Sequence, residues 1–251
     1  MEQLLEGKTA IITGAASGIG KSTAVLFAQN GANVVVADID EEQGKAVVEK
    51  LKTQGVESIF AKVDTSSAED VSDMVKTTID KFGSLDIAVN NAGVGGESAL
   101  IGDYSVESWD KTIAINLSGV FYGMKYQIPA MLEGGGGSII NMASILSQVG
   151  FARSCAYVAA KHGLVGLTKN GALEYAKEGI RVNAIGPGFI ETPLLEKNLD
   201  DEQLEQIAAL HPQGRLGKPD EVAELVLWLA SEKSSFVNGA YLPADGGYLA
   251  Q

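Results

Sequence analysis

Cysteine, long apolar runs and basic residues are all scarce in this sequence, and each scarcity excludes a class of protein. Cys155 is the single cysteine, so the chain cannot form an internal disulfide, which is typical of a reducing compartment. The first residues lack the basic and apolar regions of a signal peptide, and no apolar run approaches the roughly 18 residues of a membrane span. We therefore expect a cytoplasmic protein that is neither secreted nor embedded in a membrane.

Positive charge is in short supply, with 19 Lys and Arg residues against 32 Asp and Glu residues and a formal net charge of -13. Such a surface repels nucleic acids, anionic membranes and acidic carrier proteins, although the acidity also serves solubility. The two histidines are not spaced with carboxylates as metal ligands are, so no catalytic metal is expected. The composition favours a small, uncharged substrate and no nucleic-acid or membrane partner.

Short apolar runs alternate with longer amphipathic stretches along the chain, which is the pattern of repeated strand and helix units. The prediction is an α/β fold: a Rossmann-type, doubly wound sheet of about seven parallel strands with helices on both faces, formed by residues 1–251 as one domain. The expected strands are Lys8–Thr13, Asn33–Asp38, Ser58–Val63, Asp86–Asn90, Ser138–Met142, Arg181–Ile185 and Ala240–Leu242. The expected helices are Ile19–Asn30, Glu41–Thr53, Ala68–Phe82, Val106–Leu132 and Ala156–Lys177.

The ligand crevice of such a sheet lies beyond the carboxyl ends of its strands, so functional residues should follow the strands directly. The segment Phe189–Pro219 interrupts the alternation and contains helix-like residues with no strand after them. We interpret residues 189–219 as a lid over the substrate.

A glycine-rich loop, TGAASGIG at residues 13–20, follows the first expected strand. Gly14 permits a tight turn, Gly18 lets the main chain approach a pyrophosphate, and Gly20 allows close packing. The helix that begins at Ile19 points its free N–H groups and the positive end of its dipole at the anion. The position between strand and helix favours a dinucleotide site over a purely structural turn.

Asp38 ends the second expected strand, 18 residues after Gly20. A carboxylate there accepts hydrogen bonds from the adenosine ribose hydroxyls and repels the additional 2′-phosphate of NADP. Residues 15–16 and 39–40 supply no arginine or lysine for such a phosphate. The sequence therefore predicts NAD(H) as the cofactor, with a solvated strand-end aspartate as the alternative reading of Asp38.

Further residues at fixed intervals identify a family that the sequence resembles. In chain order they are the glycine loop, Asp64-Thr65, Asn90-Asn91-Ala92-Gly93, Asn116, Ser144, Tyr157, Lys161, Pro187-Gly188 and Thr192. This set resembles the short-chain dehydrogenase/reductase family over nearly the whole chain, and it is similar to the bacterial carbonyl reductases and alcohol dehydrogenases of that family. The resemblance implies an oxidoreductase that transfers a hydride between NAD(H) and a ketone or secondary alcohol.

Tyr157 and Lys161 lie four residues apart on one expected helix, so their side chains project from the same face. Tyrosine is a poor base at neutral pH, but a nearby ammonium group and the positive nicotinamide of NAD⁺ both favour its phenolate. We expect Tyr157 to act as the general acid or base and Ser144 to hold the substrate oxygen. Without the other motifs, a packed ring beside a solvated amine would be the ordinary interpretation of this pair.

The resemblance also implies roles for residues around this centre. Lys161 would bind the nicotinamide ribose, and the main chain of Asn116 would hold a water that relays protons through Lys161, so the predicted catalytic residues are Asn116, Ser144, Tyr157 and Lys161. The predicted cofactor-binding residues are Gly14, Ser17, Gly18, Ile19, Gly20, Asp38, Ile39, Asp64, Thr65, Asn91, Ala92, Gly93, Tyr157, Lys161, Pro187, Gly188, Ile190 and Thr192.

The substrate pocket should be walled by the residues after Ser144 and by the lid, which are largely apolar. Such a pocket suits a hydrophobic ketone or secondary alcohol and discriminates weakly between similar shapes. The predicted substrate residues are Ser144, Ile145, Arg153, Tyr157, Phe189, Leu194 and Leu195. Two alternatives stay open: a 3-oxoacyl-carrier-protein reductase, which generally prefers NADPH and docks an acidic carrier, and a non-catalytic NAD-sensing protein.

The helices expected at Val106–Leu132 and Ala156–Lys177 are more apolar than packing on one sheet face requires. Members of the family are commonly tetramers joined through these helices, so the resemblance implies a homotetramer. The ending GGYLAQ at residues 246–251 is similar to that of bacterial R-specific alcohol dehydrogenases, whose chain terminus helps to hold a structural magnesium between subunits. The same resemblance implies a structural Mg²⁺ at the C-terminus.

Overall fold

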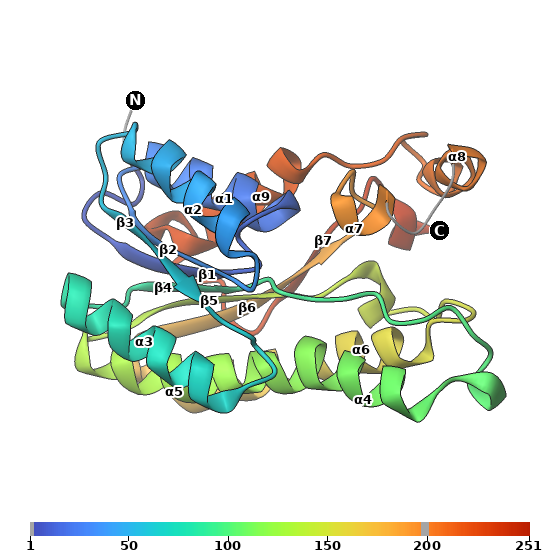
Figure 1. The fold of residues 1–251 in the computed structure, drawn as a ribbon, viewed down its shortest axis with the longest axis horizontal. Helices are drawn as coiled ribbons and strands as arrows, with labels where there is room; N and C mark the ends of the chain where they lie inside the picture. Colours follow the sequence, from blue (N-terminus) through green and yellow to red (C-terminus); the bar gives the residue numbers. More distant parts are fainter. Residues whose placement is uncertain (1–2, 197–200) are drawn as a thin grey trace.

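The computed structural model describes residues 3–196 and 201–251, and a sheet of seven parallel strands runs through its centre (Figure 1). The strands are β1 Thr9–Thr13, β2 Asn33–Asp38, β3 Ser58–Lys62, β4 Ile87–Asn90, β5 Gly137–Met142, β6 Ile180–Pro187 and β7 Tyr241–Ala244. Their order across the sheet is β3-β2-β1-β4-β5-β6-β7, so the winding reverses between β1 and β4. This doubly wound topology confirms the predicted fold class and places the ligand crevice at the carboxyl ends of the strands.

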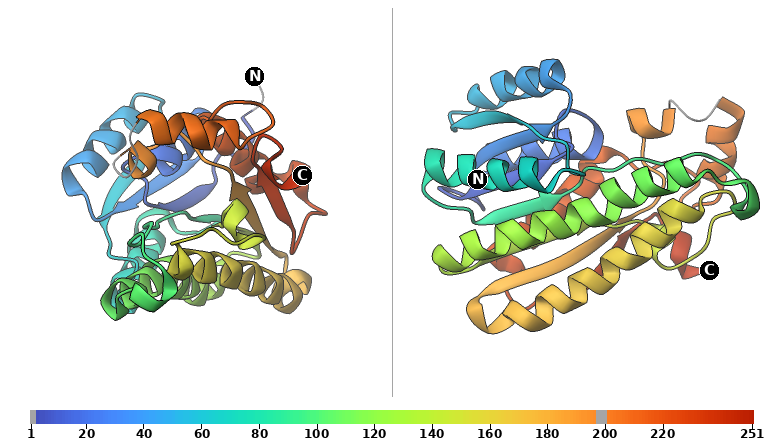
Figure 2. Two further views of the ribbon diagram at one scale, coloured as in Figure 1. Left: turned by 90° about the vertical axis from the view of Figure 1, so that its right-hand side faces the viewer. Right: turned by 60° about the horizontal axis from the view of Figure 1, so that its bottom comes forward.

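Helices cover both faces of the sheet, as Figures 1 and 2 show from three directions. The helices are α1 Gly18–Gln29, α2 Glu41–Lys52, α3 Ala68–Phe82, α4 Val106–Ile113, α5 Gly119–Glu133, α6 Cys155–Tyr175, α7 Pro193–Glu196, α8 Asp201–Ala209 and α9 Pro219–Ala230. Alternate residues of β2 serve the two layers: Val34 and Val36 join the core beneath α1, α2 and α9, whereas Val35 and Ala37 join the core on the α3, α5 and α6 side. The four central residues of β2 are therefore all apolar, because both faces of this strand are buried.

Two helical regions differ from the sequence prediction. The helix expected at Val106–Leu132 is α4 and α5 joined by a π-helical turn, Ala114–Ser118. The last helix expected from the sequence ends at Lys177, so α9, which follows the lid, was not predicted. α9 packs in the same core as α1 and α2. Pro219 opens α9 at its first turn, and the Glu221 carboxylate accepts the main-chain N–H of Lys218 at 2.8 Å, so a helix start signal was present in the sequence.

The segment predicted to be a lid leaves the sheet after β6 and carries α7 and α8. Its two ends meet in an isolated parallel bridge between Ile190 and Gly217. The lid therefore begins and ends at one place beside the sheet. Its role as a cover over the substrate remains a prediction. Among the described residues, no helix combines the length and the apolar character that crossing a bilayer requires.

Candidate active site

The glycine loop lies at the carboxyl end of β1 and runs into the N-terminus of α1. Gly14 has a φ of 65° and Gly18 a φ of 52°, a region that other residues rarely adopt. A Cβ added to Gly14 would stand 2.9 Å from Asn91 Nδ2, and one added to Gly20 would stand 2.2 Å from the Gly14 carbonyl oxygen. As in any α-helix, the first N–H groups of α1 lack partners within the helix, and Ser17 before them is exposed. The loop thus offers main-chain donors where side chains would intrude.

Asp38 is half-buried at the end of β2, directly beside the glycine loop. Its carboxylate accepts the main-chain N–H groups of Ala16 at 2.9 Å and of Asp40 at 3.0 Å, so its position is fixed. The next side chain, Ile39, is 67% exposed and forms an apolar surface at the crevice edge. These are the environments that a ribose diol and an adenine ring require.

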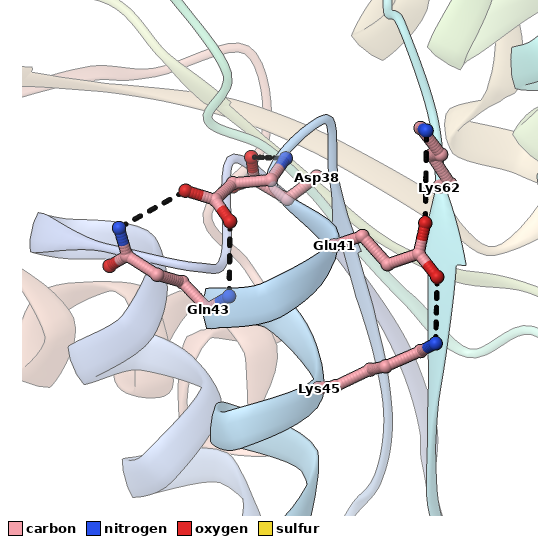
Figure 3. A network of polar contacts seen from close by, with 6 residues as sticks. Asp38, Glu41, Gln43, Lys45 and Lys62 are labelled. Carbon is pink, nitrogen blue, oxygen red and sulfur yellow. Dashed lines mark hydrogen bonds and ion pairs between the residues drawn. The ribbon is translucent and has the colours of Figure 1, made fainter.

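The lysines of this region are bound to a carboxylate (Figure 3). Glu41 holds Lys45 at 2.7 Å and Lys62 at 3.7 Å. In the register of β2 and β3, Lys62 stands opposite Asp38. The lysine opposite Asp38 in the sheet is therefore already paired with Glu41, and the hydrogen-bond partners of the Asp38 carboxylate are main-chain N–H groups.

The end of β4 is tied to the glycine loop through Asn91 and Thr13. Asn91 Nδ2 donates to the carbonyl oxygens of Thr13 and Gly14 at 2.9 and 3.2 Å. The main-chain N–H groups of Asn91 and Ala92 donate to Thr13 Oγ1 at 3.0 and 3.1 Å. The sequence predicted a main-chain role for residues 91–93, and the structure adds that the Asn91 side chain fixes the shape of the loop.

Asp64 and Thr65 follow β3 at the same edge of the sheet. Asp64 is exposed, and its carboxylate accepts the N–H and the hydroxyl of Ser66 at 2.9 and 2.6 Å. Thr65 is buried against Gly119, where an added Cβ would stand 2.8 Å from the Thr65 carbonyl oxygen. An exposed acceptor at Asp64 remains available at the crevice edge, as the resemblance implied.

Ser144, Tyr157 and Lys161 come together at the carboxyl end of β5. Ser144 lies close enough to Tyr157 for its side chain to lower the pKa of that phenol, and its Oγ accepts the N–H of Leu146 at 3.1 Å. Lys161 Nζ lies 5.4 Å from the centroid of the Tyr157 ring and donates to the Met142 carbonyl at 2.6 Å. The three side chains that the sequence singled out therefore form one connected group.

β7 supports this group through Tyr241, which the sequence analysis did not identify. The Tyr241 hydroxyl donates to the Ser144 carbonyl at 2.8 Å, while the N–H of Ser144 donates to Ser147 Oγ at 3.2 Å. Burial, and to a smaller degree the charge of Asp245, raise the pKa of Tyr241 to about 12. Tyr241 therefore stays a neutral donor at physiological pH and holds the main chain of Ser144 in place.

Burial governs the protonation of the central pair. It raises the pKa of the Tyr157 phenol above its ordinary value of 10.0, with the Ser144 hydrogen bond acting in the opposite direction. Burial also lowers the pKa of Lys161 from 10.5 to about 8. The direction of the Tyr157 shift is opposite to the phenolate that the sequence led us to expect beside Lys161 and NAD⁺, and burial is its largest cause. At pH 7 the structure presents a neutral phenol, able to donate a proton, beside a charged ammonium group.

Asn116 is fully buried in the π-helical turn and faces the loop after β4. Its Nδ2 donates to the Val94 carbonyl at 2.7 Å, and its Oδ1 accepts the Val94 N–H at 2.8 Å. A Cβ added to Gly93 would stand 3.1 Å from Asn116 Oδ1 and 3.8 Å from Lys161 Nζ. The side chain is thus occupied in fixing residues 93–94 beside Lys161, and the water relay predicted for Asn116 would rest on its main chain.

The segment after β6 returns to the glycine loop. Pro187 is buried, and the N–H of Gly188 donates to the end of β7 at 3.0 Å. Thr192 Oγ1 donates to the carbonyl of Ile190, itself buried, at 3.2 Å. A Cβ added to Gly18 would stand 3.2 Å from Thr192 Cγ2. The structure therefore places Thr192 against the predicted phosphate loop.

The predicted substrate residues lie in different surroundings. Ile145 is 1% exposed, whereas Phe189 and Leu195 are half-buried. The side chain of Leu194 lies outside the described residues. Of the predicted apolar lid residues, Phe189 is the one with an aromatic ring, and its ring contacts are described below.

Arg153 occupies an exposed, strained turn before α6, with a φ of 68°. Its guanidinium donates to Ser98 Oγ at 3.3 Å and to the Ser98 carbonyl at 3.4 Å, while its own carbonyl accepts the N–H of Ala99 at 3.2 Å. Arg153 thus connects the loop before α6 to the loop after β4.

The rings of four residues form an aromatic cluster, and only Phe189 among them is a predicted substrate residue. Phe151 contacts Phe189 at 5.8 Å between ring centroids, and Phe189 contacts His211 at 5.7 Å and Tyr248 at 6.0 Å. His211 and Tyr248 lie 5.7 Å apart. A cavity of about 170 Å³ adjoins Phe189 and His211. A lone histidine between a leucine and a proline gives no periodic signal, so sequence reasoning could not find this cluster.

Comparisons with known proteins agree with this geometry. The family profile described as enoyl-(acyl carrier protein) reductase matches residues 14–249. Cyclohexanol dehydrogenase of Acinetobacter sp. strain SE19 is 45% identical over 251 residues, covering 100% of this chain and 98% of the relative. A 2,5-dichloro-2,5-cyclohexadiene-1,4-diol dehydrogenase of Sphingobium indicum is 45% identical over 98% of both chains. The 3-oxoacyl-[acyl-carrier-protein] reductase FabG of Thermotoga maritima is 42% identical over 97% of this chain and 98% of its own.

Two solved structures superpose over almost the whole chain. Levodione reductase has a TM-score of 0.93 at 36% identity, covering 98% of this chain and 99% of its own. Carveol dehydrogenase from Mycobacterium avium in complex with NAD has a TM-score of 0.94 at 31% identity, covering 99% of both chains. The chain therefore belongs to the short-chain dehydrogenase/reductase family of oxidoreductases, which confirms the resemblance drawn from its motifs.

Proposed function

We propose that this protein is an NAD-dependent dehydrogenase that interconverts cyclic secondary alcohols and ketones. The observation that carries the proposal is the connected group of Ser144, Tyr157 and Lys161 at the crevice, together with the fixed carboxylate of Asp38 beside the glycine loop. The first set moves a proton at a carbinol or carbonyl oxygen, and Asp38 selects the cofactor.

The crevice fits a dinucleotide because the open N-terminus of α1 follows the glycine loop and the fixed carboxylate of Asp38 lies beside that loop. The N-terminus of α1 would hold the pyrophosphate, Asp38 the adenosine ribose, and Lys161 the nicotinamide ribose. Ile39 and Asp64 would border the adenine, and Ile190 and Thr192 the carboxamide. Bound NAD takes up or supplies the hydride.

The chain's own residues handle the proton. Ser144 would donate a hydrogen bond to the substrate oxygen, and the neutral Tyr157 phenol would donate its proton to that oxygen during ketone reduction. During alcohol oxidation, Tyr157 would accept the proton as a phenolate. Lys161, charged below about pH 8, would support the phenolate and pass protons toward the main chain of Asn116.

Cyclic substrates are favoured by the pocket and by the relatives. The names of the relatives include cyclohexanol, a cyclohexadiene diol, levodione and carveol. In this chain the ring of Phe189 is half-buried, the ring of Phe151 is exposed, and the two rings contact each other. Together they would form an apolar wall against which a six-membered carbocycle packs.

The test is a steady-state panel of cyclohexanol, cyclohexanone and small acyclic analogues with NAD(H) and NADP(H). The proposal expects the highest kcat/KM for the cyclic pair with NAD(H). Equal or better turnover with NADP(H) would contradict the role of Asp38, and absence of turnover with every secondary alcohol and ketone would contradict the function.

A 3-oxoacyl-carrier-protein reductase is the second candidate, because FabG of Thermotoga maritima is nearly as similar as the alcohol dehydrogenases. The net charge of -13 disfavours the docking of an acidic carrier, and the Asp38 carboxylate disfavours the 2′-phosphate of NADPH. A preference for acetoacetyl thioesters over cyclohexanone would establish this alternative. A non-catalytic NAD sensor would bind NADH without any turnover.

Assembly as a homotetramer is supported by apolar side chains exposed on α4, α5 and α6. They are Val106, Trp109, Phe121, Leu132 and Leu173.

Within the described residues no group of three or more His, Cys, Asp and Glu side chains gathers to hold a metal. A structural Mg²⁺ at the C-terminus would therefore need ligands from a second subunit. Light scattering with and without a chelator tests both: a monomer would refute the tetramer, and an unchanged mass and melting temperature would refute the magnesium.

A further inference from the structure

His211 is a buried titratable residue that the mechanism does not use. The chain has two histidines, and His162 is exposed with its ring hydrogen-bonded to its own helix at 2.9 Å. His211, by contrast, is 3% exposed and follows α8 within the lid. Its ring contacts Phe189, which is one of the predicted substrate residues.

The hydrogen bonds of His211 fix its tautomer. Nε2 lies 3.2 Å from the main-chain nitrogen of Phe189, and Nδ1 lies 3.1 Å from the Ile207 carbonyl oxygen. Because the Phe189 N–H can only donate, Nε2 must accept, and the ring proton must be on Nδ1, where it meets the carbonyl. Both nitrogens of a neutral imidazole are therefore satisfied, and one of them holds the main chain of the pocket wall.

The ring of His211 also packs closely against Gly188. A Cβ added to Gly188 would stand 2.7 Å from His211 Nε2. The imidazole meets the edge of Phe189 at an interplanar angle of 89° and lies against Tyr248. The C-terminal segment covers it, with Gln251 donating to the Leu210 carbonyl at 3.2 Å, beside α8 in Figure 1.

The neighbouring residues are held in a different way. Gly188 donates its N–H to the Ala244 carbonyl at 3.0 Å, and Glu191 donates to the Gly217 carbonyl at 2.9 Å. Phe189 instead donates to a side chain, that of His211. A change at residue 211 therefore acts on Phe189 while the anchors on either side of it persist.

We propose that His211 is a positioning residue for substrate specificity, which fixes Phe189 so that its ring and that of Phe151 form a rigid wall for a carbocyclic substrate. The proposal rests on the proposed function for its substrate, but the contacts of His211 do not. A preorganised apolar wall binds a ring without ordering its own side chains on binding, so its loss appears in the substrate KM.

Two substitutions separate the hydrogen bond from the ring. His211→Phe keeps an aromatic ring but cannot accept the Phe189 N–H, and His211→Gln keeps an acceptor but loses the ring. His162→Phe makes the same exchange at the exposed histidine and serves as the control.

We expect His211→Phe to raise the KM for cyclohexanone about tenfold with kcat changed by less than about twofold, since one buried donor loses its partner. The KM for NADH and the KM for 2-butanone should change by less than about twofold. In His211→Gln the KM for cyclohexanone should stay close to the wild-type value.

Amide hydrogen exchange at Phe189 in the resting enzyme provides a readout that needs no substrate. Exchange should be about tenfold faster in His211→Phe than in the wild type and close to wild-type in His211→Gln. Unchanged exchange in His211→Phe would overturn the proposal, as would equal KM increases for cyclohexanone and 2-butanone. If the wild type turned over neither ketone, the proposed function would fail, while the exchange rates would still decide whether His211 positions Phe189.

Discussion

Replacing Lys161 by methionine should make the stability of the protein less dependent on pH. Lys161 is 4% exposed, and burial lowers its pKa from 10.5 to about 8. Between these values the unfolded chain holds a proton that the folded protein has released, so the wild type becomes more stable as the pH rises. Below pH 8 the folded protein bears the full cost of a buried charge, and Lys161→Met has no such cost.

The size of the effect follows from the two pKa values. A lowering of the Lys161 pKa from 10.5 to about 8 changes the free energy of unfolding by about 3 kcal/mol over the whole pH range. About 2 kcal/mol of this change occurs between about pH 7 and 9.5. Lys161→Met also leaves the Met142 carbonyl without its donor at 2.6 Å, which costs about 1–3 kcal/mol at every pH. The variant should therefore be as stable as the wild type or up to about 2 kcal/mol more stable at neutral pH, and its stability relative to the wild type should be about 2 kcal/mol lower at pH 9.5 than at pH 7.

Urea unfolding of both proteins at pH 7, 8, 9 and 9.5 provides the free energies of unfolding. The difference between wild type and Lys161→Met should grow by about 2 kcal/mol over this range. Lys169→Met, at an exposed position on the same helix, is the control and should show no such trend. A difference that stays constant with pH would mean that Lys161 keeps its charge throughout, and the burial argument would be refuted.

Three further outcomes follow from the site. Asp38→Asn should raise the ratio of kcat/KM for NADPH to that for NADH by about tenfold or more, because the charge facing a 2′-phosphate is lost; an unchanged ratio would contradict this role. Gly20→Ala should lower stability by at least about 1–3 kcal/mol, since its Cβ would stand 2.2 Å from the Gly14 carbonyl, and a wild-type melting temperature would refute the crowding. Ketone reduction should fall first above about pH 8, where Lys161 loses its charge, and again above the ordinary tyrosine pKa of 10.0, because burial keeps Tyr157 protonated up to that pH; a single fall below neutral pH would contradict both pKa directions.

Much of the architecture could be predicted because its signals are local. The apolar runs of β1 and β2 and the glycines between them encode strand, turn and helix within a few residues of each other. Tyr157 and Lys161 share a helix face, so their spacing alone predicted that they lie together. Their link to Ser144 needed the sheet, but all three follow strand ends or helix starts at predictable positions.

The remainder depends on contacts between distant segments. The π-helical turn accompanies the grip of Asn116 on Val94, and no local pattern announces it. His211 acquires its role only when the lid brings it to Phe189, 22 residues earlier in the chain. The raised pKa of Tyr157 likewise arises from burial by the folded structure, which spacing cannot reveal.

The most direct test of the proposed chemistry is the Tyr157→Phe variant, assayed for both NADH binding and hydride transfer. The variant removes the hydroxyl and keeps the ring beside Lys161. NADH affinity, measured by fluorescence titration, should stay within about threefold of wild type, whereas kcat for cyclohexanone reduction should fall by at least about 10³-fold. Turnover close to wild type in a variant that binds NADH normally would contradict the assignment of Tyr157 as the proton donor.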